Sequence, residues 1–318
     1  MIKQVPSPNS PVLDWEPDFR IELEQFLRAE QFIFHAPMKK HTTFKIGGEA
    51  DVLIFPSSTE EVSKIFKLIN EFNIPCTILG NGSNVLVRDK GIRGAVIKFT
   101  ETFFGTMRCE GQRLTACAGA SLKDVSYFAA DNGLTGMEFA VGIPGSIGGA
   151  IFMNAGAYGG EMKNTVASVK AVTRDGNFVE FSGASLHLGY RHSIFQENNC
   201  AICEVELILQ RGNIDEIRYK MTDFTERRES RQPLDMPSAG STFKRPKGYF
   251  AGTLIDQTGL KGLRVGGAMV SEKHAGFVVN VGDATAQDVL NLIEEVRQRV
   301  NEAHGVTLSP EVRIIGEE

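Results

Sequence analysis

Apolar residues recur at helical spacing along several segments of this chain, and most of these segments carry a start or stop signal. Ser58 followed by Glu61 is typical of a capping box, and Gly133 and Gly305 stand where helices end. The predicted buried positions are Val62, Ile65, Phe66, Ile69 and Phe72 in the first long helix, Leu122, Val125 and Ala129 in the second, Ile214, Ile217, Met221 and Phe224 in the third, and Val289, Leu292, Ile293, Val296 and Val300 in the last. A shorter helix near the N-terminus is expected to bury Ile21, Leu23, Phe26 and Leu27.

Short apolar runs between these helices predict strands. Residues 51–55 and 76–79 flank the first long helix, so the three elements are expected to form a β-α-β unit. Further strands are expected at 85–87, 95–99, within 166–181 and 201–209, and at 312–315, whereas the glycine-containing stretch 236–282 is predicted to be rich in loops. This order of elements predicts an α+β chain with several small mixed sheets.

Composition and charge narrow the class of partner. The chain has 318 residues, a net charge of −5 and a pI of about 5.8, which argues against nucleic acid or an anionic membrane surface as the main partner. No apolar run approaches the ~18 residues that span a bilayer, and residues 1–20 lack the apolar centre of a secretory signal. A cytoplasmic protein of two or three domains, with no membrane insertion, is therefore expected.

The five cysteines are expected to be reduced thiols, because their number is odd and no export signal precedes them. Cys200 and Cys203 form a Cys-x-x-Cys pair, but His192 alone does not complete a zinc shell with them. The pair is instead predicted to enter a buried strand. The six histidines show no metal spacing, so no metal site is predicted.

Nine of the 33 glycines fall between Gly133 and Gly160, many of them in the run Gly142-Ile-Pro-Gly-Ser-Ile-Gly-Gly149. Consecutive exposed amides in such a run form a concave nest that suits phosphate oxygens. The chain contains no Gly-x-Gly-x-x-Gly and no Gly-x-x-x-x-Gly-Lys-Ser/Thr, so a nucleotide held here is bound neither by a Rossmann fingerprint nor by a P-loop. Tight turns between short strands are the alternative interpretation.

Three residues are candidates for chemistry. Ser241 follows a glycine beside Lys244 and Arg245, and a serine donates a proton only to a strongly basic group. Arg191 lies among aromatic residues, where a guanidinium stacks on a ring and binds a carboxylate with two hydrogen bonds. Glu311 precedes the last strand, where apolar surroundings raise the pKa of a carboxyl group. Each residue also has an alternative interpretation without chemistry: Ser241 lies in a Ser-Thr turn, Arg191 is a surface arginine at the start of a strand, and Glu311 is a solvated carboxylate.

Seven motifs occur in an order that closely resembles the UDP-N-acetylenolpyruvoylglucosamine reductase (MurB) family of peptidoglycan synthesis. The resemblance covers about residues 36–316 and leaves residues 1–30 outside it. The motifs are His41–Gly48, Leu79–Val87, Gly142–Gly149, Asn154–Gly159, Tyr190–Ser193, Gly240–Pro246 and Ser309–Val312.

The resemblance implies a fold of the vanillyl-alcohol-oxidase (PCMH) type, in which two α+β subdomains bind FAD and a C-terminal α+β domain binds substrate. The implied parts are an N-terminal extension (1–30), the two FAD-binding subdomains (31–100 and 101–212) and the substrate domain (213–318). By motif, the implied FAD contacts are Thr43, Phe44, Ile46, Gly47, Gly80, Asn81, Gly82, Ser83, Asn84, Gly142, Pro144, Gly145, Ser146, Gly148, Gly149, Ala155 and Gly156.

The implied reaction has two halves. NADPH passes a hydride to the flavin, and the reduced flavin passes it to an enolpyruvyl ether on UDP-N-acetylglucosamine, giving UDP-N-acetylmuramate. Arg191 and Glu311 match the residues that stabilise the developing charge, and Ser241 matches the donor that protonates the carbanion. A serine can donate a proton only to a strongly basic group, and a carbanion is basic enough to accept it. The implied reaction therefore explains how a serine could act as the acid.

The substrate's remaining contacts are expected from Tyr190 and from cations near the diphosphate, namely Lys244, Arg245, Arg228 and Arg231. One branch of the family has a tyrosine-bearing insertion that covers the diphosphate, and the few residues between Gln196 and Cys203 leave no room for it, so this chain resembles the second branch (type II). A monomer is expected. Two alternatives remain open: a flavin oxidase of the same fold that uses O₂, and a flavin-binding module without catalysis.

Overall fold

The starts of three of the longer helices are fixed by side chains of the residue before the first turn. In the computed structural model, which describes residues 13–318, each of three such hydroxyls accepts a hydrogen bond from the amide three residues later. These residues are Ser58 of α2 (Thr59–Glu71), Ser121 of α4 (Leu122–Asp131) and Thr285 of α9 (Ala286–His304). Gly133 and Gly305 follow α4 and α9 with φ of 65° and 66°, so both predicted helix ends are confirmed.

The chain divides into two units, each made of three stretches. Of the described residues, the first unit comprises 13–35, 51–81 and 94–226, and the second comprises 36–50, 82–93 and 227–318. Each unit has its own cluster of buried apolar side chains. The four-part domain division expected from the sequence is finer than these two units and stays a prediction.

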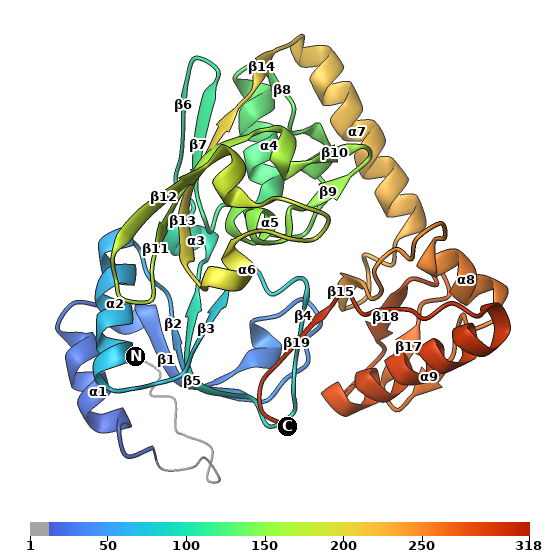
Figure 1. Cartoon of the computed structure of the whole chain (residues 1–318), viewed down its shortest axis with the longest axis horizontal. Coiled ribbons are helices and arrows are strands. Elements are labelled where there is room, and N and C mark those ends of the chain that lie inside the picture. The colour runs from blue at the N-terminus through green and yellow to red at the C-terminus, as the bar shows by residue number, and fades with distance from the viewer. Residues whose placement is uncertain (1–12) are drawn as a thin grey trace. The chain divides into compact units, whose positions relative to one another are not determined.

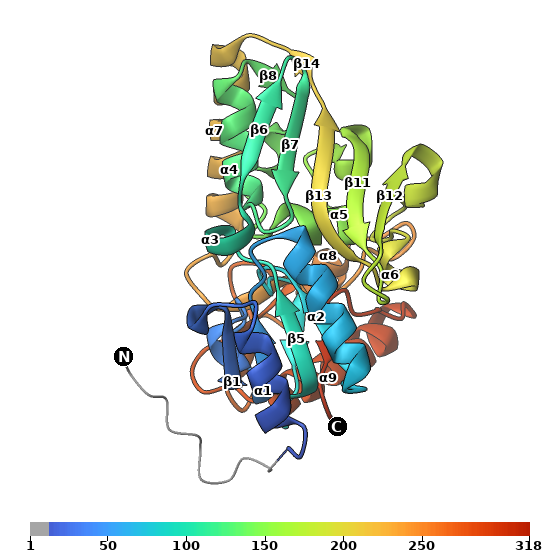
Figure 2. The same cartoon turned by 90° about the vertical axis from the view of Figure 1, so that its left-hand side faces the viewer.

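A five-stranded antiparallel sheet is the largest sheet of the first unit, and Figure 2 shows its strands side by side. Their order is β12 (Phe178–Ser182), β11 (Val166–Val172), β13 (Ala201–Ile208), β7 (Arg113–Cys117) and β6 (Met107–Glu110). The helix α5 (Ile147–Met153), which contains part of the glycine-rich run, packs against β7 and β13. The part of the glycine-rich run that lies in α5 is therefore packed on this sheet.

The predicted β-α-β unit is confirmed by β2 (Glu49–Ile54), α2 and β3 (Cys76–Leu79). These strands belong to a four-stranded sheet in the order β1 (Phe32–Pro37), β2, β5 (Ile92–Lys98) and β3, in which β3 and β5 are parallel. The remaining small elements of this unit are α3 (Glu101–Phe104), β8 (Leu134–Thr135), β9 (Gly156–Ala157), β10 (Gly160–Glu161), α6 (Phe195–Asn198) and β14 (Gln210–Arg211).

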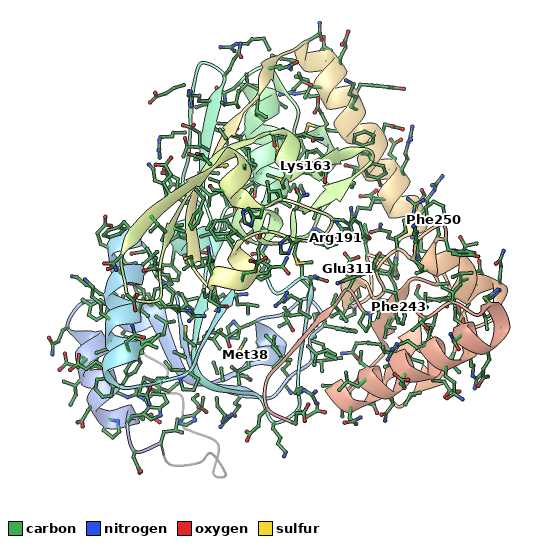
Figure 3. The ribbon with its side chains drawn as sticks, in the orientation of Figure 1. Met38, Lys163, Arg191, Phe243, Phe250 and Glu311 are labelled. Carbon is green, nitrogen blue, oxygen red and sulfur yellow. The ribbon has the colours of Figure 1, made fainter. Side chains whose placement is uncertain are left out.

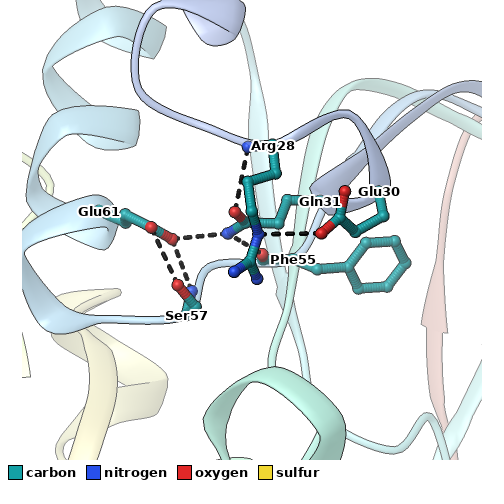
Figure 4. A network of polar contacts seen from close by, with 6 residues as sticks. All are labelled: Arg28, Glu30, Gln31, Phe55, Ser57 and Glu61. Carbon is teal, nitrogen blue, oxygen red and sulfur yellow. Dashed lines mark hydrogen bonds and ion pairs between the residues drawn. The ribbon is translucent and has the colours of Figure 1, made fainter.

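The N-terminal helix α1 (Glu16–Glu24) packs onto the first unit through Phe19 and Leu23, which are fully buried. The prediction that Ile21 belongs to its buried face is wrong, because Ile21 is 57% exposed, and Phe19 takes that place. The segment after α1 is held by Gln31, whose Nε2 donates to Phe55 O (3.0 Å) and to Glu61 Oε2 (2.7 Å), as Figure 4 shows. Glu61 accepts from Ser57, rather than completing the expected capping box with Ser58.

The second unit contains a four-stranded antiparallel sheet and the long helix α9 (Figure 1). The strand order is β15 (Ser238–Ser241), β18 (Phe277–Asn280), β17 (Ala268–Val270) and β16 (Arg264–Val265). The predicted terminal strand is confirmed as β19 (Arg313–Ile315), which pairs in parallel with β4 (Val85–Val87). Residues 236–282 were expected to be rich in loops, and more than half of them do lie outside helices and strands; the rest form this sheet and α8 (Ala251–Gln257). Its strands have two to four residues, too few for a period-2 pattern to appear.

The helix α7 (Ile214–Arg231) belongs to the first unit through residue 226 and to the second from residue 227. Ile217 and Met221 are buried in a small cluster with Ala130 and Val141. The prediction that Ile214 is buried is wrong, because it begins the helix at 43% exposure. No helix among residues 13–318 is both long and apolar enough to span a membrane.

Candidate active site

Ser241 ends β15 directly after a bulge in the second unit. Gly240 has a φ of +75°, and the pairing of β15 with β18 shifts between Ser238 and Ser241. A bulge of this kind bends the strand and changes the direction of the next side chain, which is why bulges are frequent beside active sites. Ser241 is exposed, and its hydroxyl makes no hydrogen bond within the described residues. Its proton is thus available to a ligand.

The structure brings the segment of Glu311 alongside that of Ser241. Phe243 and Pro310 form an antiparallel bridge, Glu311 N donates to Thr242 O (2.8 Å), and Lys244 N donates to Ser309 O (2.8 Å) (Figure 3). Ser241 and Glu311, which are 70 positions apart in the sequence, are therefore held by neighbouring backbone segments.

Asn84 fixes the same segment from a third part of the chain. Its Nδ2 donates to Glu311 O (3.4 Å), and its carbonyl accepts from Arg313 N (3.0 Å). Asn84 was predicted as a flavin contact, and the structure gives it this role in positioning Glu311 as well.

Thr43 forms hydrogen bonds to two other segments of the second unit, at Ser238 and at Gly82. Its Oγ1 donates to Ser238 O (2.7 Å), and its amide donates to Gly82 O (3.2 Å). Phe44 and Ile46 are each 2% exposed and belong to the apolar core of the unit. Their side chains are occupied by packing, so these two residues can reach a flavin only through their backbone.

The turn after Gly80 offers donors that the protein does not use. Among the described residues, the amides of Gly82 and Ser83 donate no hydrogen bond, although Gly82 is buried. A buried amide without a partner is costly, so such groups are normally satisfied by a ligand or water. Phosphate oxygens accept hydrogen bonds from consecutive amides of this kind. The turn therefore fits the diphosphate of FAD.

The glycine-rich run of the first unit contributes fewer free donors than expected. The amides of Gly145, Ile147 and Gly148 donate to Ile143, Ala120 and Ala118 within the protein (2.8–3.0 Å). A Cβ on Gly148 would lie 2.9 Å from Ala118 Cβ, so this glycine allows α5 to pack closely on the strand region beneath it. Close packing of backbone accounts for part of the glycine density.

Gly80 and the buried Ser146 lie against each other in the first unit, close to Gly149. A Cβ on Gly80 would lie 2.5 Å from Ser146 Oγ, so only glycine fits against this buried hydroxyl. Around Gly149 only Ser146 Oγ, at 3.5 Å, lies near a built Cβ, which leaves space for a ligand to approach. Within the run, Gly149 therefore has more space for a ligand than Gly148.

Lys98 is a buried cation that the sequence predictions missed. It ends β5 at 8% exposure, and its Nζ donates to Gly80 O (2.9 Å). Burial lowers the pKa of Lys98 from 10.5 to about 8. The signal in the sequence was a single lysine inside the otherwise apolar run 95–99.

This pKa predicts that stability rises with pH in the alkaline range. Between about pH 8 and about pH 10.5 the unfolded chain binds the Lys98 proton and the folded chain does not, so the free energy of unfolding increases by up to roughly 3 kcal/mol. Below that window both states bind the proton, and the cost of burying the charge is fully present. Urea unfolding across this range should show that the free energy of unfolding of the wild type rises relative to that of Lys98→Met. The comparison with the variant is needed because the raised pKa of the Cys203 thiol contributes in the opposite direction above about pH 9. The same pH dependence in both proteins would contradict the assignment.

Arg191 belongs to the first unit and lies in a strained turn. Its φ is +55°, and Gly189 and His192 exchange two backbone hydrogen bonds around it. Such conformations are costly for residues with a Cβ and cluster at functional sites. The guanidinium carbon lies 5.4 Å from the centre of the Tyr190 ring, as the predicted stacking requires.

The turn of Arg191 is anchored to the end of the glycine-rich segment. Asn154 Nδ2 donates to Gly189 O (2.9 Å), and the buried Ser193 Oγ donates to Phe152 O (2.8 Å). Gln196 bonds both Phe152 O and Arg191 O (2.9 Å each). The Tyr190–Ser193 and Asn154–Gly159 motifs thus lie together in space.

The predicted substrate cations lie in the second unit and reach solvent. Lys244, Arg245 and Arg231 are exposed and Arg228 is half-buried. Arg245 contacts the aromatic ring of Phe250, with its guanidinium carbon 3.9 Å from the ring centre.

The cysteines take no part in this site. Cys200 and Cys203 are buried and free, and Cys203 lies in β13, so the predicted strand is confirmed. Burial raises the pKa of Cys203 to about 12, which keeps it a neutral thiol. Within residues 13–318 no group of His, Cys, Asp and Glu has the arrangement of a metal site.

Comparison with known proteins agrees with this site. Residues 50–182 match a family model described as an FAD binding domain, and residues 232–315 match the C-terminal domain of UDP-N-acetylenolpyruvoylglucosamine reductase. Reductases of this name from Lachnoclostridium phytofermentans and Clostridium perfringens are 49% and 51% identical over 93% and 92% of this chain and 96% of each relative. The crystal structure of UDP-N-acetylenolpyruvylglucosamine reductase (MurB) from Thermus caldophilus is 37% identical, with a TM-score of 0.76 over 89% of this chain and 98% of that one.

The fold and the site define a flavoprotein whose FAD-binding part is followed by a separate C-terminal domain, and the predicted fold class is confirmed. The chain belongs to the UDP-N-acetylenolpyruvoylglucosamine reductase (MurB) family. The predicted resemblance is likewise confirmed.

Proposed function

We propose that this chain reduces UDP-N-acetylglucosamine enolpyruvate to UDP-N-acetylmuramate, with FAD as its cofactor and NADPH as the co-substrate. The observation that carries the proposal is the pairing of the Ser241 and Glu311 segments in a chain of this family. Bound FAD supplies the hydride-transfer chemistry between NADPH and the enolpyruvyl carbon. The protein supplies binding, charge and a proton.

The residues that would hold FAD come from both units. In the second unit these are the backbone of Thr43–Gly47, the free amides of Gly82 and Ser83, and Asn84. In the first unit they are Gly80, Asn81 and the stretch 142–149, in which Gly149 has open space beside it. Ala155 and Gly156 complete the assignment by their motif.

Ser241 is assigned as the proton donor to the substrate. Hydride addition to the terminal carbon of the enolpyruvyl ether leaves negative charge on the adjacent carbon, which is basic enough to take a proton from a hydroxyl. Two observations support the role: the bulge at Gly240, and the Ser241 hydroxyl, which has no hydrogen-bond partner among residues 13–318. A group that must give up its proton is best left unbonded in the free protein.

Arg191 and Glu311 are assigned to the stabilisation of that negative charge before the proton arrives. A guanidinium binds a carboxylate through two parallel hydrogen bonds, and preorganised charge lowers the barrier because no groups must reorient during the reaction. The strained turn at Arg191 and the backbone bonds around Glu311 support this role, because both positions are fixed by several contacts.

The diphosphate of the substrate is assigned to Lys244, Arg245, Arg228 and Arg231, and Tyr190 is assigned to the substrate on its motif. The chain is placed in the type II branch on the short connection between Gln196 and Cys203. We also propose a monomer and a cytoplasmic location, on the acidic charge and the sequence features given above.

An anaerobic experiment with two half-reactions tests the function. NADPH should bleach the flavin absorbance of the purified yellow protein, and the enolpyruvyl nucleotide should then restore it without O₂. The experiment separates the proposal from a flavin oxidase, which would need O₂ to recover its colour. Failure of the nucleotide to restore the absorbance would overturn the assigned substrate.

A further inference from the structure

The side chain of Asn154, directly after α5, is 2% exposed and hydrogen-bonded through both ends of its amide group. Its Oδ1 accepts from Lys163 N, and its Nδ2 donates to Glu161 Oε2 and to Gly189 O, each at 2.9 Å. An amide nitrogen has two hydrogens to donate, so this side chain uses both of them. Because the nitrogen faces two acceptors and the oxygen faces an N–H, only one orientation of the amide fits.

The end of the helix does not require this amide. Asn154 has a φ of +42°, a left-handed conformation in which helices commonly end and which glycine adopts without strain. The backbone makes the cap, since Asn154 N donates to Ile151 O (3.1 Å). All three side-chain bonds go to residues outside α5. The side chain therefore connects the helix end to other parts of the first unit.

One of those bonds holds the turn that carries Arg191. The turn spans residues 189–192, and Asn154 binds the carbonyl of its first residue, Gly189. Gln196 Nε2 donates to a second carbonyl of the turn, Arg191 O (2.9 Å). Arg191 has a φ of +55°, which a residue with a Cβ keeps only where surrounding contacts determine it. The bond from Asn154 is one of the contacts that keep this conformation.

The remaining bonds of the amide fix its own position. Glu161 lies in β10, and its Oε1 pairs with Lys163 Nζ (2.6 Å), while its second oxygen, Oε2, accepts from Asn154. The segment 160–163 thus holds the amide, and the amide holds the turn of Arg191; Figure 3 labels both Lys163 and Arg191. Groups that are fixed in advance need not reorganise when charge develops, which is how preorganised sites lower a barrier.

We propose that Asn154 is a positioning residue for Arg191, which holds the turn 189–192 in the strained conformation that directs the guanidinium to the carboxylate of the substrate. The inference rests on the proposed function and adds to it a residue that acts without touching the substrate. A misplacement of about 1 Å at a reacting group costs about 10²-fold in rate, so the turn has to be held closely. The role requires the hydrogen-bond donor at position 154 and not only its shape.

Asn154→Asp keeps the shape and removes the donor, so carboxylate oxygens would face two acceptors. The return of flavin absorbance on adding the enolpyruvyl nucleotide, measured anaerobically, should slow by roughly 10- to 100-fold. Bleaching by NADPH, which has no carboxylate, should keep its rate. Asn132→Asp is the matched control, because Asn132 ends α4 in the same unit and its Nδ2 donates to Phe128 O (2.8 Å); both of its half-reactions should keep their rates. Equal slowing of the two half-reactions in Asn154→Asp, or no slowing, would overturn the proposal.

A double variant separates the bond to Gly189 from the bond to Glu161. In Asn154→Asp with Glu161→Gln, the amide at position 161 can donate to the carboxylate at position 154, which restores one of the two lost bonds but not the bond to Gly189. This variant should be more stable to urea than Asn154→Asp and still be slow with the nucleotide. Recovery of both stability and rate would show a purely structural role. Glu161→Gln alone keeps an acceptor for Asn154 and should react as the wild type does.

Binding to the oxidised holoenzyme gives a readout that does not depend on turnover. UDP-N-acetylglucosamine is the substrate without its carboxylate. Asn154→Asp should weaken the binding of the enolpyruvyl nucleotide by roughly 10- to 100-fold, the loss typical of hydrogen bonds to a charged group, and leave that of UDP-N-acetylglucosamine unchanged. Equal weakening of both would contradict the inference. If Asn154→Asp does not retain FAD, Asn154→Gly supplies the same test, because glycine keeps the left-handed backbone.

The variant Arg191→Ala separates this inference from the function on which it rests. Adding Asn154→Asp to Arg191→Ala should cause little further slowing, because Asn154 acts through Arg191, and additive losses would contradict that. If Arg191→Ala is slow with the nucleotide and Asn154→Asp is not, the function stands and the positioning role is wrong. If the nucleotide does not restore the absorbance in the wild type, the proposed function itself fails.

Discussion

Replacing Ser241 by alanine is expected to slow the substrate half-reaction by roughly 10²- to 10⁴-fold, the usual contribution of a positioned general acid. NADPH-driven bleaching of the flavin should keep its rate, because that half-reaction needs no proton from residue 241. Anaerobic stopped-flow absorbance measures both rates in the same protein. Equal slowing of the two halves would contradict the role as proton donor.

The Ser241→Ala substitution should affect the chemistry without affecting the fold, because it removes no hydrogen bond among the described residues and no buried group. Ser241 is exposed and its hydroxyl has no hydrogen-bond partner among the described residues, so its loss should change the free energy of unfolding by less than about 0.5 kcal/mol. Thr242, its neighbour, is the opposite case: it is 4% exposed, and its hydroxyl accepts from Val278 N (3.0 Å). A rate loss in Ser241→Ala accompanied by full stability would therefore locate the effect in the chemistry.

Gly47→Ala is expected to destabilise the second unit by roughly 2–6 kcal/mol and to reduce the fraction of protein that retains FAD. Gly47 has a φ of +129°, and a Cβ there would lie 2.5 Å from Val87 Cβ. Val87 is fully buried in β4, so it has no room to move away. The cost of backbone strain and the cost of the clash with Val87 therefore add in Gly47→Ala. Both act on the segment that is assigned to FAD.

Gly282→Ala is the matched control for that substitution. Gly282 lies in the same unit with a φ of +139°, but nothing lies within 4 Å of a built Cβ. Its loss should therefore show the cost of backbone strain alone. Urea unfolding and the flavin-to-protein absorbance ratio, measured for both variants, separate the two effects. Equal destabilisation of the two variants would show that the contact with Val87 contributes nothing.

Local signals predicted the long helices well because their causes are local. The α9 helix begins at Thr285 and Asp288, which exchange the two hydrogen bonds of a capping box, and all five predicted apolar positions are buried. The same approach did not identify the short strands within residues 236–282, because they pair across the sheet over stretches too short to show a period. Ile21 failed for a related reason, because a short helix with few apolar residues fits more than one buried face.

The candidate site shows a similar division. Motifs selected Ser241, Glu311 and Arg191, but they gave no sign that Asn84 bonds the backbone of Glu311 or that Lys98 bonds Gly80. They also assigned Gly148 to phosphate binding, whereas its position against Ala118 shows a packing role. The residue type alone does not distinguish a glycine that allows close packing from a glycine that makes room for a ligand.

The sequence by itself determined the family, the helices and the kinds of residue available for chemistry, because these depend on motif order, spacing and side-chain type. Only the tertiary structure decided which groups are buried, which amides are left without partners and which distant segments pair. Those properties arise from contacts between residues far apart in the chain, such as Thr242 with Glu311, and a linear pattern does not contain them.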